Sequence, residues 1–589
     1  MCGIIGYRGD KDSKRIVIEG LKSLEYRGYD SWGIATVLND RVAVFKKVGK
    51  IGGFSADQLK MEAGRIAIGH TRWATHGNVT EANAHPHVSC DGKIAVVHNG
   101  IIENYQELKA ELKDHKFVSQ TDTEIIPHLI EGYVREGYGF VEATKRALSR
   151  LEGRFAVVAV MAGYDGLIGA RRGSPLVLGL GGGEREYFIA SDIPAFLNHT
   201  RNVVFLEDNE LVVLNKDYRI MNIKTGEDIK REPQHIDWDA AQAEKGDYPH
   251  FMIKEVLEQR DTVSRAIKQS DGEIMEVAKM LNDSFGSFFV ACGTAGKVAL
   301  AGTYLFSRIA NKHVNFSVSS EFPNYTHFLT DKTLMIVVSQ SGETADTLEA
   351  MDAARAKGVK IVGVVNVMGS TITRQADRFL LVKAGPEKCV ASTKATTGQL
   401  AIVTLLAYAC AGRLEEGREL LEDASAKINA ILTEEYVANI RALAEKIKGW
   451  ESMYIIGRGL NYPMALEAAI KVQEVSYIHA EGFAGGELKH GPIALISNGT
   501  PCIVLVANDE TKPDILSNAV EVKARGGFII GVAPKNNEVF DFWIPVPDVG
   551  NASPIVNIIP VQILAYHLAV LRGCNPDMPR NLAKSVTVK

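Results

Sequence analysis

The sequence predicts an α+β domain at the N-terminus, followed by two similar α/β domains with parallel sheets. Residues 1–230 contain many short runs of strand-forming residues with helical patterns between them, as in α+β domains with packed sheets. From about residue 285, strand, loop and helix patterns alternate, as in doubly wound α/β domains. Three motifs of this region recur 164 to 168 residues later, which indicates a duplicated domain.

The first domain is the one with the most strand patterns. Residues 179–191 contain three consecutive glycines. Because no helix pattern follows them closely, a turn between two strands is favoured over a phosphate loop. The expected strands cover residues 31–38, 42–48, 65–73, 93–100, 154–161 and 205–215, and the expected helices cover residues 13–24, 103–114, 122–135 and 139–150.

A polar stretch containing Pro233 and Pro249 lacks periodicity and is expected to link the first domain to the second. Beyond it, the duplication is visible in three pairs of segments. Residues 288–302 resemble 453–469, residues 334–348 resemble 501–516, and residues 360–367 resemble 528–535. The predicted limits are 2–231 for the first domain, 232–250 for the linker, 251–430 and 431–575 for the two copies, and 576–589 for a C-terminal tail.

The composition is that of a soluble globular protein. Of the 589 residues, 46% are hydrophobic and the formal net charge is −5, so nothing in the charge indicates nucleic acid or an anionic membrane as a partner. Residues 400–412 and 554–571 are apolar but too short or too interrupted to span a bilayer, and core helices are expected there. Seven scattered cysteines without a C-x-x-C pair predict no zinc motif and no disulfide framework, which favours a reducing, cytoplasmic compartment.

Cys2 stands where a reactive side chain is unusual. By itself it favours a small buried residue of a first strand. If Met1 is removed, however, Cys2 gains a free α-amino group with an unperturbed pKa of about 7.7–8.0, which can accept the thiol proton near neutral pH. The thiol would then act as a nucleophile, and the working protein would have to lack Met1.

Several polar residues near expected strand ends favour the nucleophilic interpretation. Asn99 and Gly100 follow a strand and can supply an amide and a backbone N–H to an oxyanion hole. Arg72 can bind a carboxylate and Asp122 can pair with an amine. The His85-Pro86-His87 segment offers two metal ligands but no third at a defined spacing, so no metal is predicted there.

The two copies of the duplicated domain differ at one turn. In the first copy a strand ends in Ser339–Thr344, which supplies hydroxyls, a glycine and a helix start suited to a phosphate. The second copy has 506–511 there, without the serines and with an added acid. Since both copies must make the same turn, an anion site is expected in the first copy only, with Ser392 near a second polar helix start.

A helix over 463–477 is expected, with Asn461 as its N-cap. Lys471 and Glu474 share a face of this helix, which by spacing alone favours a surface ion pair. Together with His490, sixteen residues after Glu474, they can also serve acid–base chemistry on a sugar. Lys584, in the tail, would alone be interpreted as a solvated charge.

These motifs carry a family resemblance that covers nearly the whole chain. MCGIIGY, LEYRGYDS, HTRWATHG, HNGIIEN and SQTDTE resemble the class II glutamine amidotransferases, which are N-terminal-nucleophile hydrolases with an αββα fold. ACGT, SQSGETADT, VASTKA, IKVQEVSYIHAE, GELKHGP and PRNLAKSVTV resemble a pair of α/β/α sugar-isomerase domains. The combination implies transfer of the L-glutamine amide nitrogen to D-fructose 6-phosphate and isomerisation to D-glucosamine 6-phosphate, the first step of hexosamine synthesis.

The resemblance also implies roles for individual residues. In the first domain, Cys2 matches the nucleophile that forms a glutamyl thioester, and Trp73 matches the gate of an ammonia channel. In the second half, His490 matches the residue that opens the sugar ring, Lys584 the lysine that forms a Schiff base, and Glu474 the base that moves a proton between C1 and C2. The remaining matches are Asn99 and Gly100 for the oxyanion hole, Arg72, Thr75, His76 and Asp122 for glutamine, and Thr294, Ser339, Gln340, Ser341, Thr344, Ser392 and Lys471 for the sugar phosphate.

No metal or redox cofactor is implied by this chemistry, and a homodimer is implied by family precedent, with His490 reaching the site of the other subunit. Two positions depart from the family pattern: Ala295 replaces a common serine and Trp32 a common small residue. Ala295 leaves open an amidotransferase that aminates a different keto-sugar phosphate. A non-catalytic sugar-phosphate sensor is disfavoured because Cys2, Glu474, His490 and Lys584 are all present.

Overall fold

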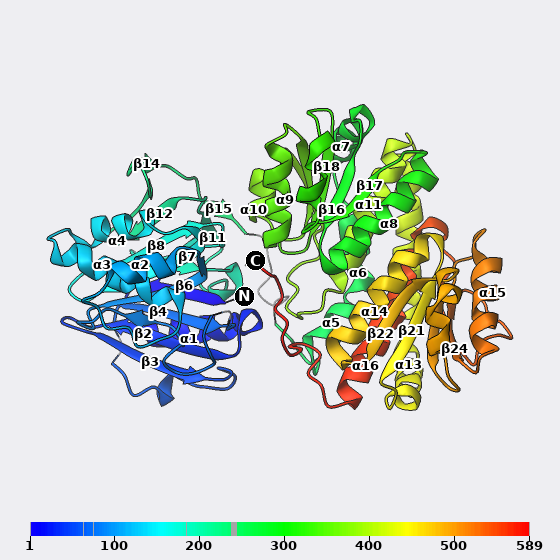
Figure 1. Cartoon of the computed structure of the whole chain (residues 1–589), viewed down its shortest axis with the longest axis horizontal. Coiled ribbons are helices and arrows are strands. Elements are labelled where there is room, and N and C mark those ends of the chain that lie inside the picture. The colour runs from blue at the N-terminus through cyan, green and yellow to red at the C-terminus, as the bar shows by residue number, and fades with distance from the viewer. Residues whose placement is uncertain (1, 63, 75, 184, 237–243, 588–589) are drawn as a thin grey trace. The chain divides into compact units, whose positions relative to one another are not determined.

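The computed structural model describes residues 2–62, 64–74, 76–183, 185–236 and 244–587, and the chain forms two compact units (Figure 1). Unit 1 comprises Met1–Glu244 and Ala583–Lys589, and unit 2 comprises Lys245–Leu582. Within the predicted linker, Gln234–His235 form strand β15 of unit 1, whereas residues 237–243 lie outside the described residues.

Unit 1 contains two antiparallel sheets. Among the described residues, the first sheet has the order β15 (Gln234–His235), β11 (Asn202–Phe205), β9 (Val177–Leu180), β10 (Tyr187–Ala190), β1 (Gly3–Arg8), β4 (Ile66–Arg72), β2 (Ser31–Val37) and β3 (Val42–Val48). The second has the order β14 (Asp228–Ile229), β13 (Tyr218–Asn222), β12 (Glu210–Leu214), β8 (Leu167–Arg172), β7 (Gly153–Met161), β6 (Ile94–Ile102) and β5 (His87–Val88).

Alternating side chains place these sheets in the predicted αββα layers. Ile5 packs in the core beneath α1 (Ser13–Ser23), whereas its neighbour Ile4 packs in the core between the two sheets. Val97 lies in the same inter-sheet core, while Val96 packs beneath the helices on the other side. Those helices are α2 (Tyr105–Glu111), α3 (Ile125–Arg135) and α4 (Phe140–Ser149). The glycine-rich segment forms the turn between the antiparallel strands β9 and β10, as predicted.

Unit 2 contains two parallel sheets whose strand orders are equivalent, which confirms the duplication. Ile336 and Ile503 occupy matching strands, as do Gly363 and Gly531. Among the described residues, the first sheet has the order β17 (Asn315–Val318), β16 (Phe288–Ala291), β18 (Leu334–Ser339), β19 (Lys360–Val365) and β20 (Arg378–Leu381). The second has the order β22 (His479–Ala484), β21 (Ser452–Gly457), β23 (Pro501–Leu505), β24 (Phe528–Ala533) and β25 (Phe542–Pro545).

Helices cover both faces of each parallel sheet, as expected for α/β/α layers. One continuous core joins the inner faces of the two sheets through α8, α11, α14 and α16, while α9 and α15 cover the outer faces (Figure 1). The helices of unit 2 are α5 (Phe251–Leu257), α6 (Gln259–Ala266), α7 (Asp271–Asp283), α8 (Gly293–Ala310), α9 (Ala345–Arg355), α10 (Thr371–Gln375), α11 (Lys394–Cys410), α12 (Leu414–Ile431), α13 (Glu434–Ile447), α14 (Tyr462–Ser476), α15 (Lys512–Lys523) and α16 (Ser553–Leu571).

The two apolar stretches are core helices, as predicted. Residues 400–412 fall largely within α11, whose residues are almost all buried. Among the described residues, one helical stretch, Gly550–Leu571, is long and apolar enough to cross a membrane, with a mean hydropathy of 1.7. Because 83% of its most apolar part is buried inside the unit, core packing explains its apolar character.

The predicted N-cap of α14 is wrong in its chemistry. Asn461 stands at the N-cap position, but its side chain makes no capping hydrogen bond. Its Nδ2 donates to Ser553 Oγ at 3.2 Å, and its Oδ1 accepts from Asn557 Nδ2 at 2.9 Å. Both partners lie on α16, so Asn461 ties α14 to α16 instead of closing its own helix end.

The start of α14 lies close against Gly457 at the end of β21. A Cβ added there would lie 2.2 Å from the backbone oxygen of Asn461, so the backbone of unit 2 would have to shift. Gly457→Ala is expected to destabilise unit 2 by about 1–3 kcal/mol, seen as a lower urea midpoint of its unfolding transition. Gly449→Ala is the control, since no atom lies within 4 Å of its added Cβ. Equal midpoints for the two variants would contradict the packing argument.

Candidate active sites

The sulfur of Cys2, at the start of the strand β1, lies against the backbone that follows β4. The N–H of Trp73 donates to Cys2 Sγ at 3.3 Å, and the Trp73 carbonyl oxygen lies 3.5 Å from the same sulfur. Burial raises the pKa of the Cys2 thiol, whereas the Trp73 N–H and the Arg72 guanidinium act to lower it. The thiol therefore has a donor and a cation beside it, as a nucleophile needs.

Asn99 lies next to Cys2, and Gly100 follows it on β6. Asn99 Nδ2 donates to the carbonyl oxygen of Cys2 at 2.9 Å, and its Oδ1 lies 3.1 Å from His70 Nε2. Only one of the two amide protons is used by the Cys2 carbonyl, which leaves one for an oxyanion. Gly100 has a φ of +133°, and a Cβ there would lie 1.9 Å from the Arg154 backbone oxygen, so the position demands glycine.

The predicted glutamine-binding residues differ in the hydrogen bonds that they already make within the protein. Asp122 accepts the N–H of Ile102 through Oδ2 at 2.8 Å. Arg72 is buried and donates to the backbone oxygens of Asn78, at 3.2 Å, and of His76. Its guanidinium thus holds the following loop, and that loop would have to move before Arg72 could bind a carboxylate. Thr75 lies outside the described residues.

A network of buried histidines behind Asn99 was not predicted as part of the site. Burial lowers the pKa of His70 to about 3, and it also lowers the pKa values of His85, His87 and His98, so the rings are neutral. His70 stacks on His85 with 4.0 Å between ring centroids, and through its bond to Asn99 it orients the amide. The sequence signal was weak, because the partners of His70 come from other strands.

In unit 2, the turn after β18 has the predicted form. Ser339 Oγ accepts the N–H of Gly342 at 2.9 Å, and Ser341 Oγ accepts the N–H of Glu343 at 3.2 Å. Gly342 has a φ of +66°. Thr344 is the N-cap residue of α9 but its side chain makes no capping hydrogen bond, and Gln340 is half-buried beside it. Hydroxyls and a helix N-terminus therefore converge here, as a phosphate site requires.

The matching turn of the second copy is filled by its own carboxylate. Asp509 Oδ1 accepts the N–H of Thr511 at 3.0 Å and its hydroxyl at 2.7 Å, ahead of the helix α15. Asp509 also lies 3.4 Å from the Arg308 guanidinium. A second anion at this turn would meet that carboxylate, so the structure supports the prediction of an anion site in the first copy alone.

Lys471 and Glu474 form an ion pair in which the lysine is buried and the glutamate is half-buried, so the exposed surface pair favoured by spacing alone is wrong. The Lys471 side chain is fully buried, with its Nζ 2.6 Å from Glu474 Oε2 and 3.5 Å from Glu467 Oε1. Burial lowers the pKa of Lys471, but the two carboxylates outweigh burial and raise it overall. Glu467, which sequence reasoning missed, accepts a hydrogen bond from Thr294 Oγ1 at 3.1 Å, so residues of both copies meet at this cluster.

The remaining predicted sugar-site residues come from other segments of the chain. Ser392 donates to Glu387 Oε2 at 3.0 Å just before α11. His490 is exposed at the end of a short 3-10 turn, Glu487–His490. Lys584 belongs to the C-terminal segment that is part of unit 1.

The two departures from the family pattern do not involve reacting groups. Trp32 is buried on β2, with its ring 5.4 Å from that of Phe45 and 4.8 Å from that of Phe54. It fills the core beneath α1. Ala295 is half-buried in the first turn of α8, next to Thr294. Neither side chain changes the charge of a site.

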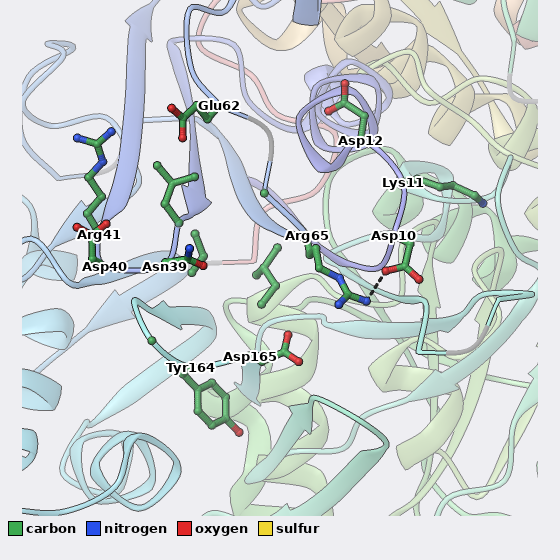
Figure 2. Close-up of a pocket in the computed structure, with 15 residues that line it drawn as sticks. Asp10, Lys11, Asp12, Asn39, Asp40, Arg41, Glu62, Arg65, Tyr164 and Asp165 are labelled. Atoms are coloured by element: carbon green, nitrogen blue, oxygen red, sulfur yellow. Dashed lines mark hydrogen bonds and ion pairs between the residues drawn. The ribbon is translucent and has the colours of Figure 1, made fainter.

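Unit 1 also has a pocket outside the predicted sites. Its volume is about 1030 Å³, and charged side chains dominate it (Figure 2). Asp10 after β1 forms an ion pair with Arg65 before β4, and Asp165 from the β7–β8 turn lies nearby. None of the predicted glutamine-site residues lines this pocket.

Comparison with known families agrees with this fold. Residues 70–198 match the family described as glutamine amidotransferase domain, and residues 280–409 and 446–572 match the SIS domain family. The class is therefore a glutamine amidotransferase domain followed by two SIS domains, with an N-terminal-nucleophile fold in unit 1.

Full-length relatives narrow the class. The glutamine–fructose-6-phosphate aminotransferases [isomerizing] of Thermococcus kodakarensis and Pyrococcus horikoshii are 47% and 46% identical over the whole of both chains. Among solved structures, the C-terminal domain of glucosamine-fructose-6-phosphate aminotransferase from Francisella tularensis is 34% identical, with a TM-score of 0.54 over 57% of this chain and 100% of its own. The chain belongs to the glutamine–fructose-6-phosphate aminotransferase (isomerizing) family.

The buried carboxyl of Glu467 makes the stability of unit 2 depend on pH. Burial raises its pKa from 4.5 to about 7, so the folded protein holds this proton more tightly than the unfolded chain does. The resulting stability is complete below about pH 4.5 and is lost as the pH rises to about 7. Relative to Glu467→Gln, the wild type is expected to lose up to about 3 kcal/mol of unfolding free energy across that range.

Urea unfolding of unit 2 at several pH values measures this difference. Glu451→Gln, at an exposed position, is the control and should follow the wild type. If Glu467→Gln and the wild type changed in parallel with pH, the carboxyl of Glu467 would not be the group that titrates.

Proposed function

We propose that the chain transfers the amide nitrogen of L-glutamine to D-fructose 6-phosphate and isomerises the product to D-glucosamine 6-phosphate, releasing L-glutamate. The observation that carries this proposal is the presence of two complementary centres in one chain. Unit 1 holds a thiol beside Asn99 and Gly100, and unit 2 holds a buried lysine–carboxylate cluster and a hydroxyl-rich turn. The full-length relatives carry the name of this reaction.

In unit 1, Cys2 is the proposed nucleophile. After removal of Met1, the free α-amine takes the thiol proton, and the sulfur attacks the glutamine amide carbon. Asn99 Nδ2 and the Gly100 N–H stabilise the oxyanion, and the proton passes to the departing nitrogen as ammonia leaves. Water then hydrolyses the thioester to glutamate and restores the thiol. Trp73, whose N–H already touches the sulfur, is the proposed gate for ammonia.

The glutamine is oriented by its charged ends. Arg72 binds the α-carboxylate once the loop that it now holds rearranges, and Asp122 binds the α-ammonium. Thr75 and His76 complete the loop around the substrate. Closure of this loop would also exclude water, which keeps ammonia from being protonated before it reaches the sugar.

In unit 2, the sugar phosphate is proposed to bind at the turn after β18. Ser339, Gln340, Ser341 and Thr344 supply the phosphate contacts, and the start of α9 adds its partial positive charge. Thr294 and Ser392 are proposed to contact the sugar. The bond between Thr294 and Glu467 links this binding region to the Lys471 cluster, which supports a single sugar site built by both copies.

The sugar chemistry is proposed to proceed by imine formation and proton transfer. His490 assists opening of the ring, and Lys584 forms a Schiff base with the ketone, releasing water. Ammonia then displaces the lysine amine. Glu474 removes the proton from C1 and returns it at C2, which converts the ketose imine into the amino aldose. Lys471 holds the Glu474 side chain in position, with 2.6 Å between its Nζ and Glu474 Oε2.

The proposed working form is a cytoplasmic homodimer, in which His490 reaches the site of the other subunit. The exposure of His490 in the single chain is compatible with that role. Neither nucleic acid nor a membrane is a proposed partner. The reaction itself needs no redox cofactor, because it consists of thioester hydrolysis, amine addition and proton transfer.

Mass spectrometry of the products tests the acceptor. With glutamine, fructose 6-phosphate should yield an amino-sugar phosphate, whereas other keto-sugar phosphates should yield little. Amination of another sugar phosphate in preference to fructose 6-phosphate would favour the alternative acceptor, which the relatives do not favour.

Cys2→Ala separates the two centres. Because the thiol is needed only to release ammonia, glutamine-dependent synthesis should fall by several orders of magnitude. Synthesis driven by added ammonium salt, and isomerisation of fructose 6-phosphate, should persist. Amino-sugar formation with each nitrogen source is the measurement. Equal loss of both activities in a folded variant would contradict the two-centre arrangement.

Ser341→Ala tests the phosphate site. Loss of one hydrogen bond to a charged phosphate costs about 1.5–3 kcal/mol, so the KM for fructose 6-phosphate should rise about 10–100-fold while glutaminase activity is kept. Asn508→Ala, at the matching turn of the second copy, is the control and should leave this KM unchanged. A raised KM in both variants, or in neither, would contradict a phosphate site in the first copy alone.

A further inference from the structure

Four side chains in unit 1 that the proposed reaction does not use meet at one point. They are Cys90, His115, His128 and Glu131, and their ligand atoms all lie within 4.8 Å of one another. Cys90 lies in the turn between β5 and β6, His115 lies in the loop after α2, and the other two lie one turn apart on α3. Three of the four side chains are buried, while the thiol is accessible from solvent.

The separations suit one small cation. Cys90 Sγ lies 3.7 Å from His115 Nδ1 and 3.6 Å from His128 Nδ1, and Glu131 Oε2 lies 2.9 Å and 3.7 Å from the same two nitrogens. Tetrahedral zinc, with bonds of about 2.3 Å to sulfur and about 2.0–2.2 Å to nitrogen and oxygen, needs ligand atoms about 3.2–3.7 Å apart. The His115–Glu131 pair, now in direct contact, would have to open slightly.

Hydrogen bonding alone leaves this cluster poorly satisfied. His115 Nδ1 can donate to Glu131 Oε2 at 2.9 Å and the thiol can donate to His128 Nδ1, but the 3.7 Å between His128 Nδ1 and Glu131 Oε2 is too long for a hydrogen bond. The other ring nitrogen of His128, Nε2, is buried and makes no hydrogen bond with the described residues. A cation on Nδ1 would fix the proton on Nε2, which faces Glu124 Oε1 at 3.7 Å.

The surrounding groups match those of a metal centre. Arg135 donates to Glu131 Oε1 at 2.6 Å and the N–H of Asp91 donates to the same oxygen at 3.1 Å, while Oε2 lies in the cluster and accepts the N–H of Cys90 at 3.2 Å. The N–H of Lys116 donates to Cys90 Sγ at 3.3 Å, as backbone amides do to metal-bound thiolates.

We propose that Cys90, His115, His128 and Glu131 bind one zinc ion in a tetrahedral site. A thiolate, two imidazoles and a carboxylate are ligands that zinc prefers, and the two anionic ligands balance its charge. Since four protein ligands fill the shell, the role is structural. The ion joins the turn before β6 to the helix α3. Asn99 lies on β6, and Asp122 begins the short 3-10 turn that precedes α3. This site does not depend on the proposed function.

Metal analysis of the full chain tests the site. Elemental analysis of the purified protein, or of chelator-treated protein reloaded with Zn²⁺, should give one zinc per chain. Cys90→Ser and His115→Gln should each lose it, whereas Cys574→Ser and His235→Gln, which lie outside the cluster, should keep it. Cys2→Ala should also keep it, which excludes binding at the nucleophile. Loaded with Co²⁺, the wild type should show a thiolate-to-cobalt absorption band that is absent in Cys90→Ser.

Stability gives a second readout that does not require the variants to fold well. Removal of zinc by a chelator should lower the melting temperature of unit 1 in the wild type and leave unit 2 unchanged. A wild-type chain that takes up neither Zn²⁺ nor Co²⁺ would overturn the proposal. So would zinc that remains bound in both Cys90→Ser and His115→Gln.

Discussion

In unit 1, a hydrogen bond between Asn99 and Cys2 joins the two sheets at the proposed nucleophile. Asn99 on β6 donates to the carbonyl oxygen of Cys2, next to β1, although 97 residues separate them. The bond requires the core between the sheets to hold these strands at a fixed spacing, and it requires the backbone that only glycine allows at Gly100. The position of the Cys2 backbone therefore depends on the packing of the two sheets.

Unit 2 depends on a different constraint, the burial of a charge. Lys471 is removed from water, and its charge is kept only because Glu474 and Glu467 lie within reach on the same helix. Glu467 is in turn held by Thr294, which comes from α8 of the other copy. The cluster is thus complete only when the two copies share one core, so folding and the proposed proton transfer have the same requirement.

The layers and the duplication were predictable because strand and helix periods repeat wherever one face is buried. Cys2 and Asn99 were found because they lie in short motifs at strand ends. His70 and Glu467 were missed, since each is a lone polar residue whose partner comes from another element. The same reason explains the wrong cap at Asn461, whose partner Ser553 lies 92 residues away. Local spacing cannot reveal contacts that only tertiary packing makes.

The two copies differ at their matching strand-to-helix turns, which explains why the proposed sugar site needs residues from both. Each copy must turn from strand to helix, but the second stabilises that turn with the carboxylate of Asp509, whereas the first uses the hydroxyls of Ser339 and Ser341. A carboxylate in that place repels a phosphate, so the second copy has a self-sufficient turn that is unsuited to an anion. It contributes α14 instead, with Lys471 and Glu474. In the proposed reaction, binding and proton transfer are therefore divided between the copies, which ties the proposed sugar site to their shared interface.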